Sequence, residues 1–555
     1  MRSRVSLRAA ILDLVLVVAG TAMAFRPTLQ SGFDRMQSDP GDTVFLNYVL
    51  EHETRVLGGG EHAGSLWSPP FFFPACDVLT YSENLLGTLP IYAALRGGLQ
   101  PDTAYQVWGI VMLAFCYVSM AFALRRLSIA MPLASLGAFV FAYGLERTSH
   151  LGHGQLLPAA FTPLAILALA QHARTPARRF LAAALLASFL QVTAGVYLGW
   201  LLLFGGAAFA LLLLVTDAGI RQRQLEFLRG RPVFVLSAIL IWAGALLLFL
   251  RPYIVEAREL PPRPWSDLLL LLPRPRSWIS APTGSLWAQL GDVFRPDTPL
   301  VWEHRLFPGA IPCLIVLIGL AVALRVGGEE RARRSLVLAA LGSVLVLGAS
   351  SLRLPVKLLG VSLGGERVEY LTAWSFVYDL VPGATSIRAV GRIWTAMLPL
   401  ALVGGLLALD IVLSSVRSTR LRGWATAVIV SVGVVEQYQA GLPSFDKREF
   451  RGDVRSTRDA LAGSGCDAVY VHLDPSKPFY YSQLVGMWSG LQEGVAVING
   501  YSGNFPPGYP DPTRSMTDAE LRTWLSNAPP GRYCVVEPTG PGLPRRVRLL
   551  EDRGK

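Results

Sequence analysis

Charged residues are scarce in this sequence, and the usual signatures of soluble enzymes are missing. Only 16% of the 555 residues are charged, whereas 52% are hydrophobic, which excludes an ordinary soluble globular protein. Walker-type phosphate loops and HExxH are absent. No Ser/His/Asp arrangement stands out either, so an ATP-driven role, a nucleophilic serine and a zinc-peptidase site are not indicated.

Cysteine is also rare. The five cysteines contain no CxxC pair or other zinc-ligand spacing, so the sequence indicates no structural zinc site. Cys466 and Cys534 each adjoin a β-rich run near the C-terminus. A disulfide between them is chemically permitted in an oxidising compartment. Its geometry is not readable from sequence, so paired and free thiols both remain open.

The positive net charge has a distinctive distribution. The formal charge is +11, but the arginines fall in short clusters between apolar runs instead of on one solvated face. This pattern is typical of cytoplasmic loops of membrane proteins and excludes nucleic acid as a partner. We therefore predict a multi-pass membrane protein with membrane lipids around it.

Apolar runs of about 20 residues, the length that spans a bilayer, recur along the chain. We predict about eleven transmembrane helices, with Gly195 as the turn inside one overlong run. The predicted spans are 9–25, 104–124, 131–143, 156–170, 180–194, 197–215, 233–250, 310–324, 336–350, 393–413 and 424–438.

The loops divide by charge into two sides. Basic clusters follow every second span, so the N-terminus is predicted to be cytoplasmic, with an uncleaved first helix. The long loops at 26–103, 251–308 and 351–392 then lie outside, together with the C-terminal tail. In a bacterium this arrangement predicts an inner-membrane protein that does its chemistry on the extracytoplasmic side.

The tail differs in character from the rest of the chain. Residues 467–473, 493–499 and 532–538 are short β-rich runs, and 517–526 is helix-compatible. We therefore predict a transmembrane domain over 1–442 and a small soluble α/β extracytoplasmic domain over 443–555. The loop at 499–509, NGYSGNFPPGY, is either a packing turn or a lid that stacks on a sugar.

Most candidate chemistry lies in the first outer loop. Residues 41–53 form a helical pattern with an apolar side, which predicts a short amphipathic helix at the membrane interface. Asp42 stands at its N-terminal end, so it is either a helix cap or a functional carboxylate. Glu83 and Tyr81 belong to a second such run after an aromatic, proline-rich segment at 66–74.

Several motifs together carry a resemblance to a known superfamily. They are GDxxxxNxxLEH at 41–52, FFFP and DVLTYSENLLG at 71–87, HLGHGQLLPAAFTPLA at 150–165, RPYIVEAREL at 251–260, SIRAVGR at 386–392 and NGYSGNFPP at 499–507. This combination resembles a group of bacterial membrane proteins that is in turn similar to the GT-C glycosyltransferases.

The resemblance implies a function. GT-C enzymes transfer a sugar from a polyprenyl-phosphate carrier to an extracytoplasmic acceptor, and a carboxylate early in the first outer loop is the general base. By this resemblance the base is Asp42, with Asp39 as its rival, and Glu51 or Glu83 completes an acidic pair. The implied partners are a lipid-linked sugar donor and a glycan, lipid or protein acceptor.

Other residue patterns fit such a site. Arg388 and Arg392 share a helix face on the outer side and suit an anionic partner such as a leaving phosphate, or else lipid phosphates. His150, His153 and His52 could contact a phosphate or a divalent cation, or serve as ordinary polar loop residues. No cofactor is otherwise indicated.

Two other classes of function remain open. A transporter or flippase of lipid-linked saccharides would also be polytopic, but charges at mid-membrane and repeated halves, which transporters tend to have, are not evident here. A non-catalytic protein of envelope glycan assembly is the other alternative. Convergence of the outer acids, histidines and arginines on one place would favour the enzyme.

Overall fold

The protein is described here from a computed structural model. It covers residues 7–60, 65–325, 331–355, 370–538 and 545–552. Parts of the predicted loops at 26–103 and 351–392, and parts of the predicted tail domain, lie outside these residues.

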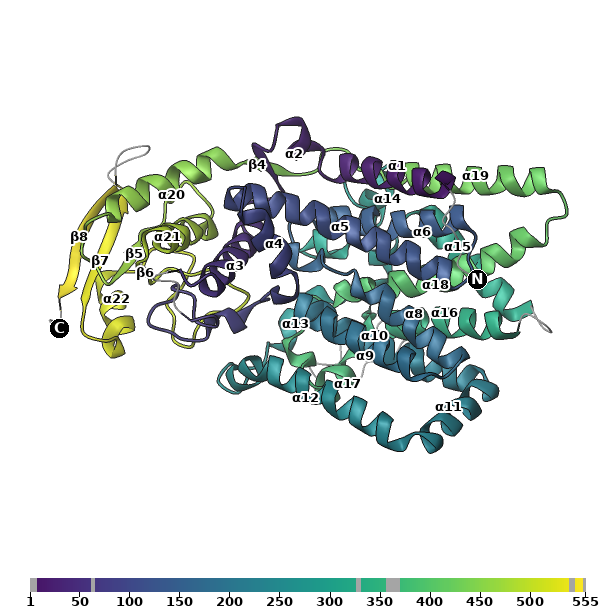
Figure 1. Ribbon diagram of the computed structural model, residues 1–555. Helices are drawn as coiled ribbons and strands as arrows, with labels where there is room; N and C mark the ends of the chain where they lie inside the picture. Colours follow the sequence, from purple (N-terminus) through teal and green to yellow (C-terminus); the bar gives the residue numbers. More distant parts are fainter. Residues whose placement is uncertain (1–6, 61–64, 326–330, 356–369, 539–544, 553–555) are drawn as a thin grey trace.

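All eleven predicted apolar segments are helical in the structure (Figure 1). Gly195 separates α9 from α10, as predicted, and its backbone interrupts the helix. These helices are α1 (Leu7–Ala24), α5 (Pro101–Arg126), α6 (Met131–Tyr143), α8 (Phe161–Arg174), α9 (Arg178–Ala194), α10 (Val196–Thr216), α12 (Pro232–Glu256), α15 (Ala310–Arg325), α16 (Arg331–Ser351), α18 (Trp394–Ser414) and α19 (Thr419–Val435).

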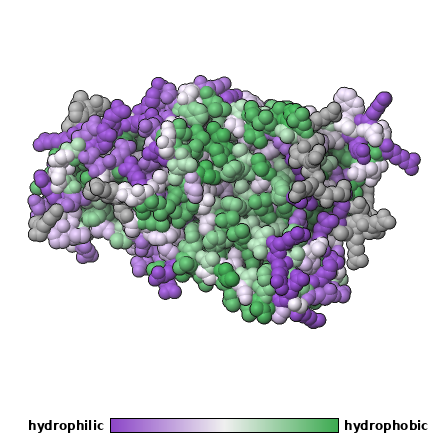
Figure 2. All heavy atoms as spheres, in the orientation of Figure 1, coloured by the Kyte–Doolittle hydropathy of each residue, from purple (hydrophilic) through white to green (hydrophobic). Residues whose placement is uncertain are grey.

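The chain is a multi-pass membrane protein. Within the described residues, 6 helical segments are long and apolar enough to cross a membrane, and two shorter apolar helices accompany them. The 6 segments are 101–126, 154–174, 196–216, 232–256, 333–351 and 390–414. Figure 2 shows apolar residues over the middle of the molecule and hydrophilic residues towards both ends.

The helical bundle is built around α18. In the most apolar 18-residue stretch of the segment 390–414, which contains α18, 83% of the residues are buried. In the corresponding stretch of α12, only 11% are buried. Helix α18 packs against α15, α16, α10 and α6, so it is central, and α12 presents an apolar face to the surroundings. The N-terminal end of α18 thus has a fixed position, and the residues just before it are held in place.

Shorter elements fill the loops between the long helices. The helical ones are α2 (Arg26–Gln30), α3 (Asp42–Leu57), η1 (Val78–Tyr81), η2 (Leu86–Thr88), α4 (Leu89–Arg96), α7 (Leu145–Ser149), η3 (Gly154–Leu156), α11 (Ala218–Gly230), α13 (Trp265–Leu271), η4 (Pro275–Trp278), α14 (Ala288–Val293), η5 (Val301–His304), α17 (Trp374–Leu380), η8 (Ala384–Ser386) and η9 (Val390–Ile393). The strands β2 (Leu354–Pro355) and β3 (Tyr370–Leu371) pair with each other.

The C-terminal part contains a four-stranded sheet with helices. The sheet order is β6 (Ala496–Val497), β5 (Ala468–Val471), β7 (Arg532–Pro538) and β8 (Arg545–Asp552); β5 is parallel to β6 and β7, and β8 is antiparallel. The helices are α20 (Lys447–Leu461), α21 (Phe479–Glu493), α22 (Asp518–Trp524) and η10 (Leu525–Asn527). The predicted strands are present, whereas β8, α20 and α21 were not predicted.

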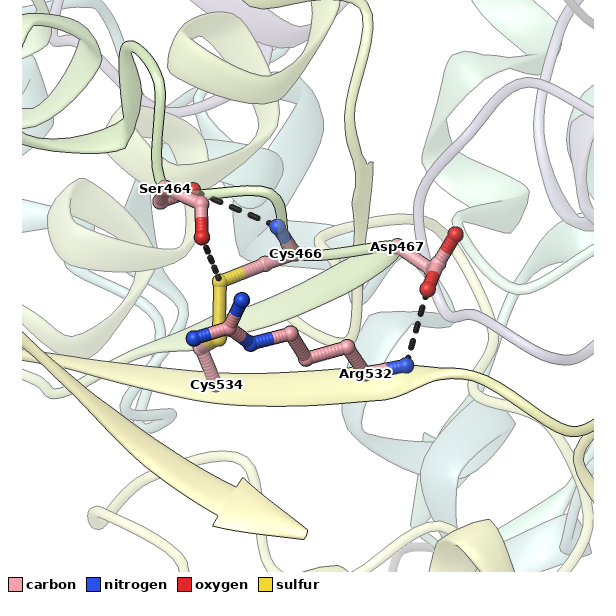
Figure 3. The surroundings of a disulfide bond; sticks show 5 residues. All are labelled: Ser464, Cys466, Asp467, Arg532 and Cys534. Carbon is pink, nitrogen blue, oxygen red and sulfur yellow. Dashed lines mark hydrogen bonds between the residues drawn. A yellow bond between two sulfur atoms is a disulfide. The ribbon is translucent and has the colours of Figure 1, made fainter. Parts of the chain in front are cut away.

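A disulfide joins Cys466 to Cys534 across the neighbouring strands β5 and β7 (Figure 3). Beside it, the backbone amide of Arg532 donates to the carboxylate of Asp467. The open question between paired and free thiols is thus answered in favour of the pair.

The C-terminal part packs directly on the first outer loop. Strand β4 (Ser444–Asp446) pairs with β1 (Arg35–Gln37), and the Trp488 indole of α21 donates to the carbonyl of Val44 at 3.3 Å. As a result, every residue of α3 from Thr43 to Glu53 is buried. Helix α3 is therefore not the predicted amphipathic interface helix, because its polar side is covered as well: Glu51 accepts from Arg96 of α4, and Arg55 donates to the carbonyl of Leu491 in α21.

Candidate active site

Asp42 is the first residue of α3, and its carboxylate has two side-chain donors. His153 Nδ1 lies 2.8 Å from Oδ2, and the Tyr501 hydroxyl donates to Oδ1 at 2.8 Å. The residue at the cap position is Gly41, and Asp42 makes no cap hydrogen bond. The alternative that Asp42 is a helix cap is therefore wrong. Its side chain is 32% exposed, so a substrate can reach the carboxylate.

His153 connects Asp42 to a second carboxylate. Its Nε2 lies 3.3 Å from Oε1 of Glu303 in η5, while its Nδ1 contacts Asp42. Glu303 in turn accepts from Arg392 Nη2 at 2.7 Å. The four side chains form a continuous chain of alternating charge from the residues before α18 to the start of α3.

Arg392 lies in η9, just before the central helix α18. Its side chain is 9% exposed, as Glu303 is 8% exposed, and its guanidinium lies 5.7 Å from the centre of the Tyr197 ring. The Tyr197 hydroxyl donates to the carbonyl of Ala389 at 2.6 Å. Tyr197 therefore fixes the backbone segment that carries both candidate arginines.

Two glycines position His153. A Cβ on Gly152 would lie 2.2 Å from Oγ of Ser38, and a Cβ on Gly154 would lie 2.0 Å from the hydroxyl oxygen of Tyr105. Both contacts are far shorter than atoms tolerate. The motif HLGHGQ thus requires its glycines because the histidine loop lies directly against α5 and the residues before α3.

Charge interactions define the protonation of this chain. Burial raises the pKa of Asp42, but hydrogen bonds from His153 and Tyr501 and the charge of Arg392 outweigh it, so the pKa is lowered to about 2. Burial likewise opposes ionisation of Glu303, yet Arg392 and His153 hold its pKa well below the usual value. Burial and Arg392 disfavour a charged His153, but the two carboxylates prevail and raise its pKa.

Asp39 and Glu83, the other candidate acids, have different partners. Asp39 accepts from the amide of Gly41 at 2.7 Å and so shapes the entry to α3. Glu83 accepts from the amides of Val196 and Tyr197 at 2.6 and 2.8 Å. Glu83 thus holds the N-terminus of α10, the helix whose Tyr197 contacts Arg392, and borders the site without bonding to Asp42.

His150 and Arg388 also lie close by. The His150 ring is 5.9 Å from the rings of both His153 and Trp394, and its Nδ1 faces the carbonyl of Glu146 at 2.7 Å. Arg388 is exposed and lies near Tyr197 and Arg263.

The backbone of Tyr81 supports the 499–509 loop. A Cβ on Gly503 would lie 2.7 Å from the Tyr81 carbonyl oxygen. Arg263 donates to the carbonyl of Gly503 at 2.6 Å. The loop that carries Tyr501 is therefore held from two sides.

Glu51 and His52 are placed away from this group. Glu51 accepts from Arg55, Arg96 and Tyr92 at 3.1, 2.6 and 3.1 Å, which ties α3 to α4. His52 Nε2 faces the carbonyls of Ser65 and Leu66 at 3.2 and 3.3 Å. Both side chains have structural partners and point elsewhere than Asp42.

In the part of the chain that the structure describes, no three histidine, cysteine or acidic side chains are grouped in a way that could hold a metal ion. Around Asp42, both ring nitrogens of His153 are already engaged by carboxylates.

Two residues of the site were not predicted as site residues. Glu303 lies in a proline-rich outer loop without a recognisable motif, and Tyr501 was noted only as part of the possible lid. Glu303 could have been found by asking which outer carboxylate neutralises Arg392. Tyr501 carries the sole aromatic hydroxyl in NGYSGNFPP, which was a weak signal.

Two solved structures illustrate what this chain is similar to. The archaeal oligosaccharyltransferase AglB from Archaeoglobus fulgidus, in complex with an inhibitory peptide and a dolichol-phosphate, matches 94% of this chain and 69% of its own, with a TM-score of 0.45 and 11% identity. ArnT from Cupriavidus metallidurans in the apo state matches 96% and 92%, with a TM-score of 0.36 and 12% identity.

The TM-scores of both structures are below 0.5, so they place no constraint on the site of this chain. No family model matches the sequence, and no curated protein matches it.

Proposed function

We propose that this chain is a membrane glycosyltransferase that moves a sugar from a polyprenyl-phosphate carrier to an acceptor outside the cytoplasm. The observation that carries the proposal is the chain Asp42, His153, Glu303 and Arg392, in which a reachable carboxylate is connected to a cationic end. Sugar transfer from a phosphate requires a proton acceptor and a cationic site for the leaving group.

Asp42 has the role of general base. As the new bond forms between the acceptor oxygen and the anomeric carbon, the hydroxyl proton passes to the carboxylate of Asp42. The Tyr501 hydroxyl, which donates to Oδ1 at 2.8 Å, occupies the place that an acceptor hydroxyl would take. When the acceptor displaces Tyr501, Asp42 exchanges one donor for another, and His153 continues to orient it.

The leaving phosphate departs with the electron pair of its bond to the anomeric carbon. Arg392 is already neutralised by Glu303, so the exposed Arg388 is the better partner for this new charge. Arg388 and Arg263 are close enough to repel each other, and a phosphate between them would relieve that repulsion. Arg392 then positions His153 through Glu303.

The sidedness of the proposal is supported by two features. Cys466 and Cys534 form a disulfide, which persists in oxidising compartments outside the cytoplasm. The C-terminal part that contains it contacts Asp42 through Tyr501. The basic loops at the opposite end agree with a cytoplasmic location there. We therefore place the site on the extracytoplasmic side, and in a bacterium on the inner membrane.

The test compares lipid extracts from the native host. Deletion of the gene should cause one lipid-linked saccharide to accumulate, and the wild-type chain should remove it. Asp42→Asn should leave the accumulation in place although the protein is made and inserted. Asp77→Asn is the matched control, because Asp77 is an exposed carboxylate of the same outer loop, and it should restore turnover.

A second assay separates transfer from transport. Purified protein in detergent is mixed with the accumulated lipid-linked saccharide and an extract of host envelope glycan. A transferase should release the sugar from its lipid without an intact membrane, whereas a flippase should not. Full turnover by Asp42→Asn would contradict the role of Asp42, and no turnover by the wild-type chain would favour the flippase.

A further inference from the structure

A cleft lies between the C-terminal part and the first outer loop. It has a volume of about 490 Å³ and is bordered by α20, α21, α3 and the start of α5. Val44 and Asn47 of α3 line it. At about 100° per residue, these positions lie on the side of α3 opposite to Asp42. The cleft is therefore separate from the candidate active site.

One wall of the cleft is a row of basic side chains on α20. Lys447, Arg451, Arg455 and Arg458 all line it. Their spacing of four, four and three residues places them on one face of the helix. With a rise of about 1.5 Å per residue, the row is roughly 16 Å long. In Figure 2, hydrophilic residues gather over this end of the molecule.

The row is only partly neutralised. Asp102 is the one carboxylate among the lining residues, and it is shared by Arg451 at 2.5 Å and Lys447 at 3.3 Å. Arg458 pairs with Asp459, but the two side chains are 39% and 59% exposed, and such surface pairs are weak. Arg455 is exposed, and no ion pair is found for it among the described residues. The wall thus keeps a positive charge over its length.

The remaining walls are not basic. Asn47, Gln100 and Gln492 contribute amide groups, and the half-buried ring of Phe445 also lines the cleft. Amides can exchange hydrogen bonds with hydroxyl groups, and a ring can pack on the apolar face of a sugar. The volume falls within the usual range of ligand sites, about 300 to 1,000 Å³.

We propose that this cleft binds an anionic glycan chain, with carboxylate or phosphate groups along the arginine row and hydroxyl groups on the amides. The three arginines extend over about two helical turns, roughly 10 Å, which is longer than a single phosphate requires. This inference rests on the proposed function. The bound glycan is the distal part of the acceptor, and its reacting end extends past α3 to Asp42.

The test is a binding measurement on the purified full chain in detergent. The probe is fluorescent hexagalacturonate, with one carboxylate per sugar, and neutral fluorescent maltohexaose is the reference. Hexagalacturonate should bind, more weakly as salt is raised, and maltohexaose should bind at least tenfold less well. The double variant Arg455→Gln, Arg458→Gln should lose roughly tenfold in affinity, since two charge-assisted hydrogen bonds are removed.

The matched control removes two arginines elsewhere. Arg420 and Arg422 are exposed at the start of α19, at the other end of the molecule, and their glutamine variants should bind normally. Asp42→Asn should also bind normally, so loss of transfer and loss of this site are distinguishable.

Three results would overturn the proposal. One is equal binding of hexagalacturonate by the α20 double variant and the wild-type chain. Another is equal binding of maltohexaose. The third is displacement of the probe by phosphatidylglycerol nanodiscs or by millimolar inorganic phosphate, which would assign the cleft to a lipid headgroup or a free anion.

Discussion

His153 Nδ1 lies 2.8 Å from Asp42 Oδ2, although the two residues are 111 positions apart in the sequence. Its other ring nitrogen faces Glu303 at 3.3 Å. A histidine between two carboxylates is stabilised as the imidazolium, and each carboxylate is stabilised as the anion. The charge of the candidate base, Asp42, is thus stabilised by His153, and the charge of His153 is stabilised by Asp42 and Glu303.

This relationship predicts a pH-dependent contribution of His153 to stability. The pKa of His153 is raised in the folded chain, so its stabilising effect is complete below the ordinary value of about 6.5 and is lost as pH rises through the folded pKa. We expect His153→Gln to lower the free energy of unfolding by about 2 kcal/mol at pH 6, and by less at pH 9. Thermal unfolding in detergent at both pH values measures the difference.

His472→Gln is the control for this experiment. Burial lowers the pKa of His472, so charge on this residue does not favour the folded chain, and His472→Gln should not cost more stability at pH 6 than at pH 9. An effect of His153→Gln that is independent of pH would contradict a charged His153.

Glu303 and Arg392 predict strong coupling in a double-mutant cycle. Both side chains are less than 10% exposed and lie 2.7 Å apart. Removal of either partner leaves a buried charge, so Glu303→Gln and Arg392→Gln should each cost about 3 kcal/mol of unfolding free energy. The double variant should cost less than the sum by at least roughly 1 kcal/mol. Strictly additive changes in thermal stability would mean that the pair is not formed.

The helical part of this fold could be predicted because apolar runs dictate membrane helices directly. Each of the eleven runs is a helix, and the break at Gly195 is where the sequence placed it. The apolar runs alone do not fix how many of these helices cross the membrane. Segments such as α15 are apolar but short, and their depth depends on the packing of their neighbours.

The candidate site could be predicted only in part. Asp42, His153 and Arg392 stand in motifs that the sequence displays, and they do meet. Glu303 was missed because its importance comes entirely from contacts with residues distant in sequence. Likewise, α3 has an amphipathic pattern, but its polar side is also buried, against α4 at Glu51, and no local pattern could reveal that cover.

The packing around Gly154 predicts a rescue experiment. A Cβ at this position would lie 2.0 Å from the Tyr105 hydroxyl oxygen, so Gly154→Ala should displace the His153 loop and reduce transfer at least about tenfold, as small displacements of catalytic groups do. Tyr105→Phe removes the clashing oxygen. Since this buried hydroxyl has no hydrogen-bond partner among the described residues, its loss should cost little by itself.

The double variant Gly154→Ala, Tyr105→Phe should therefore recover part of the transfer rate, measured as release of sugar from its lipid carrier. Gly98→Ala is the control, because a Cβ there meets nothing within 4 Å. If the double variant is no better than Gly154→Ala alone, the hydroxyl contact does not set the position of the loop.

The position of Tyr501 predicts that its substitution changes the KM for the acceptor and leaves kcat nearly unchanged. Its hydroxyl donates to Asp42 Oδ1 at 2.8 Å, where the proposed acceptor hydroxyl must donate during transfer. Tyr501→Phe removes this competitor, so the KM for the acceptor should fall by up to about tenfold, the equivalent of one hydrogen bond to a charged group. The kcat should stay within about twofold, because Asp42 and His153 are unchanged.

Tyr480→Phe is the control, since its ring packs beside Tyr501 with centres 6.0 Å apart. A raised KM in Tyr501→Phe alone would instead show that Tyr501 holds the acceptor, and an equal fall in kcat and kcat/KM would show that it acts in the transition state.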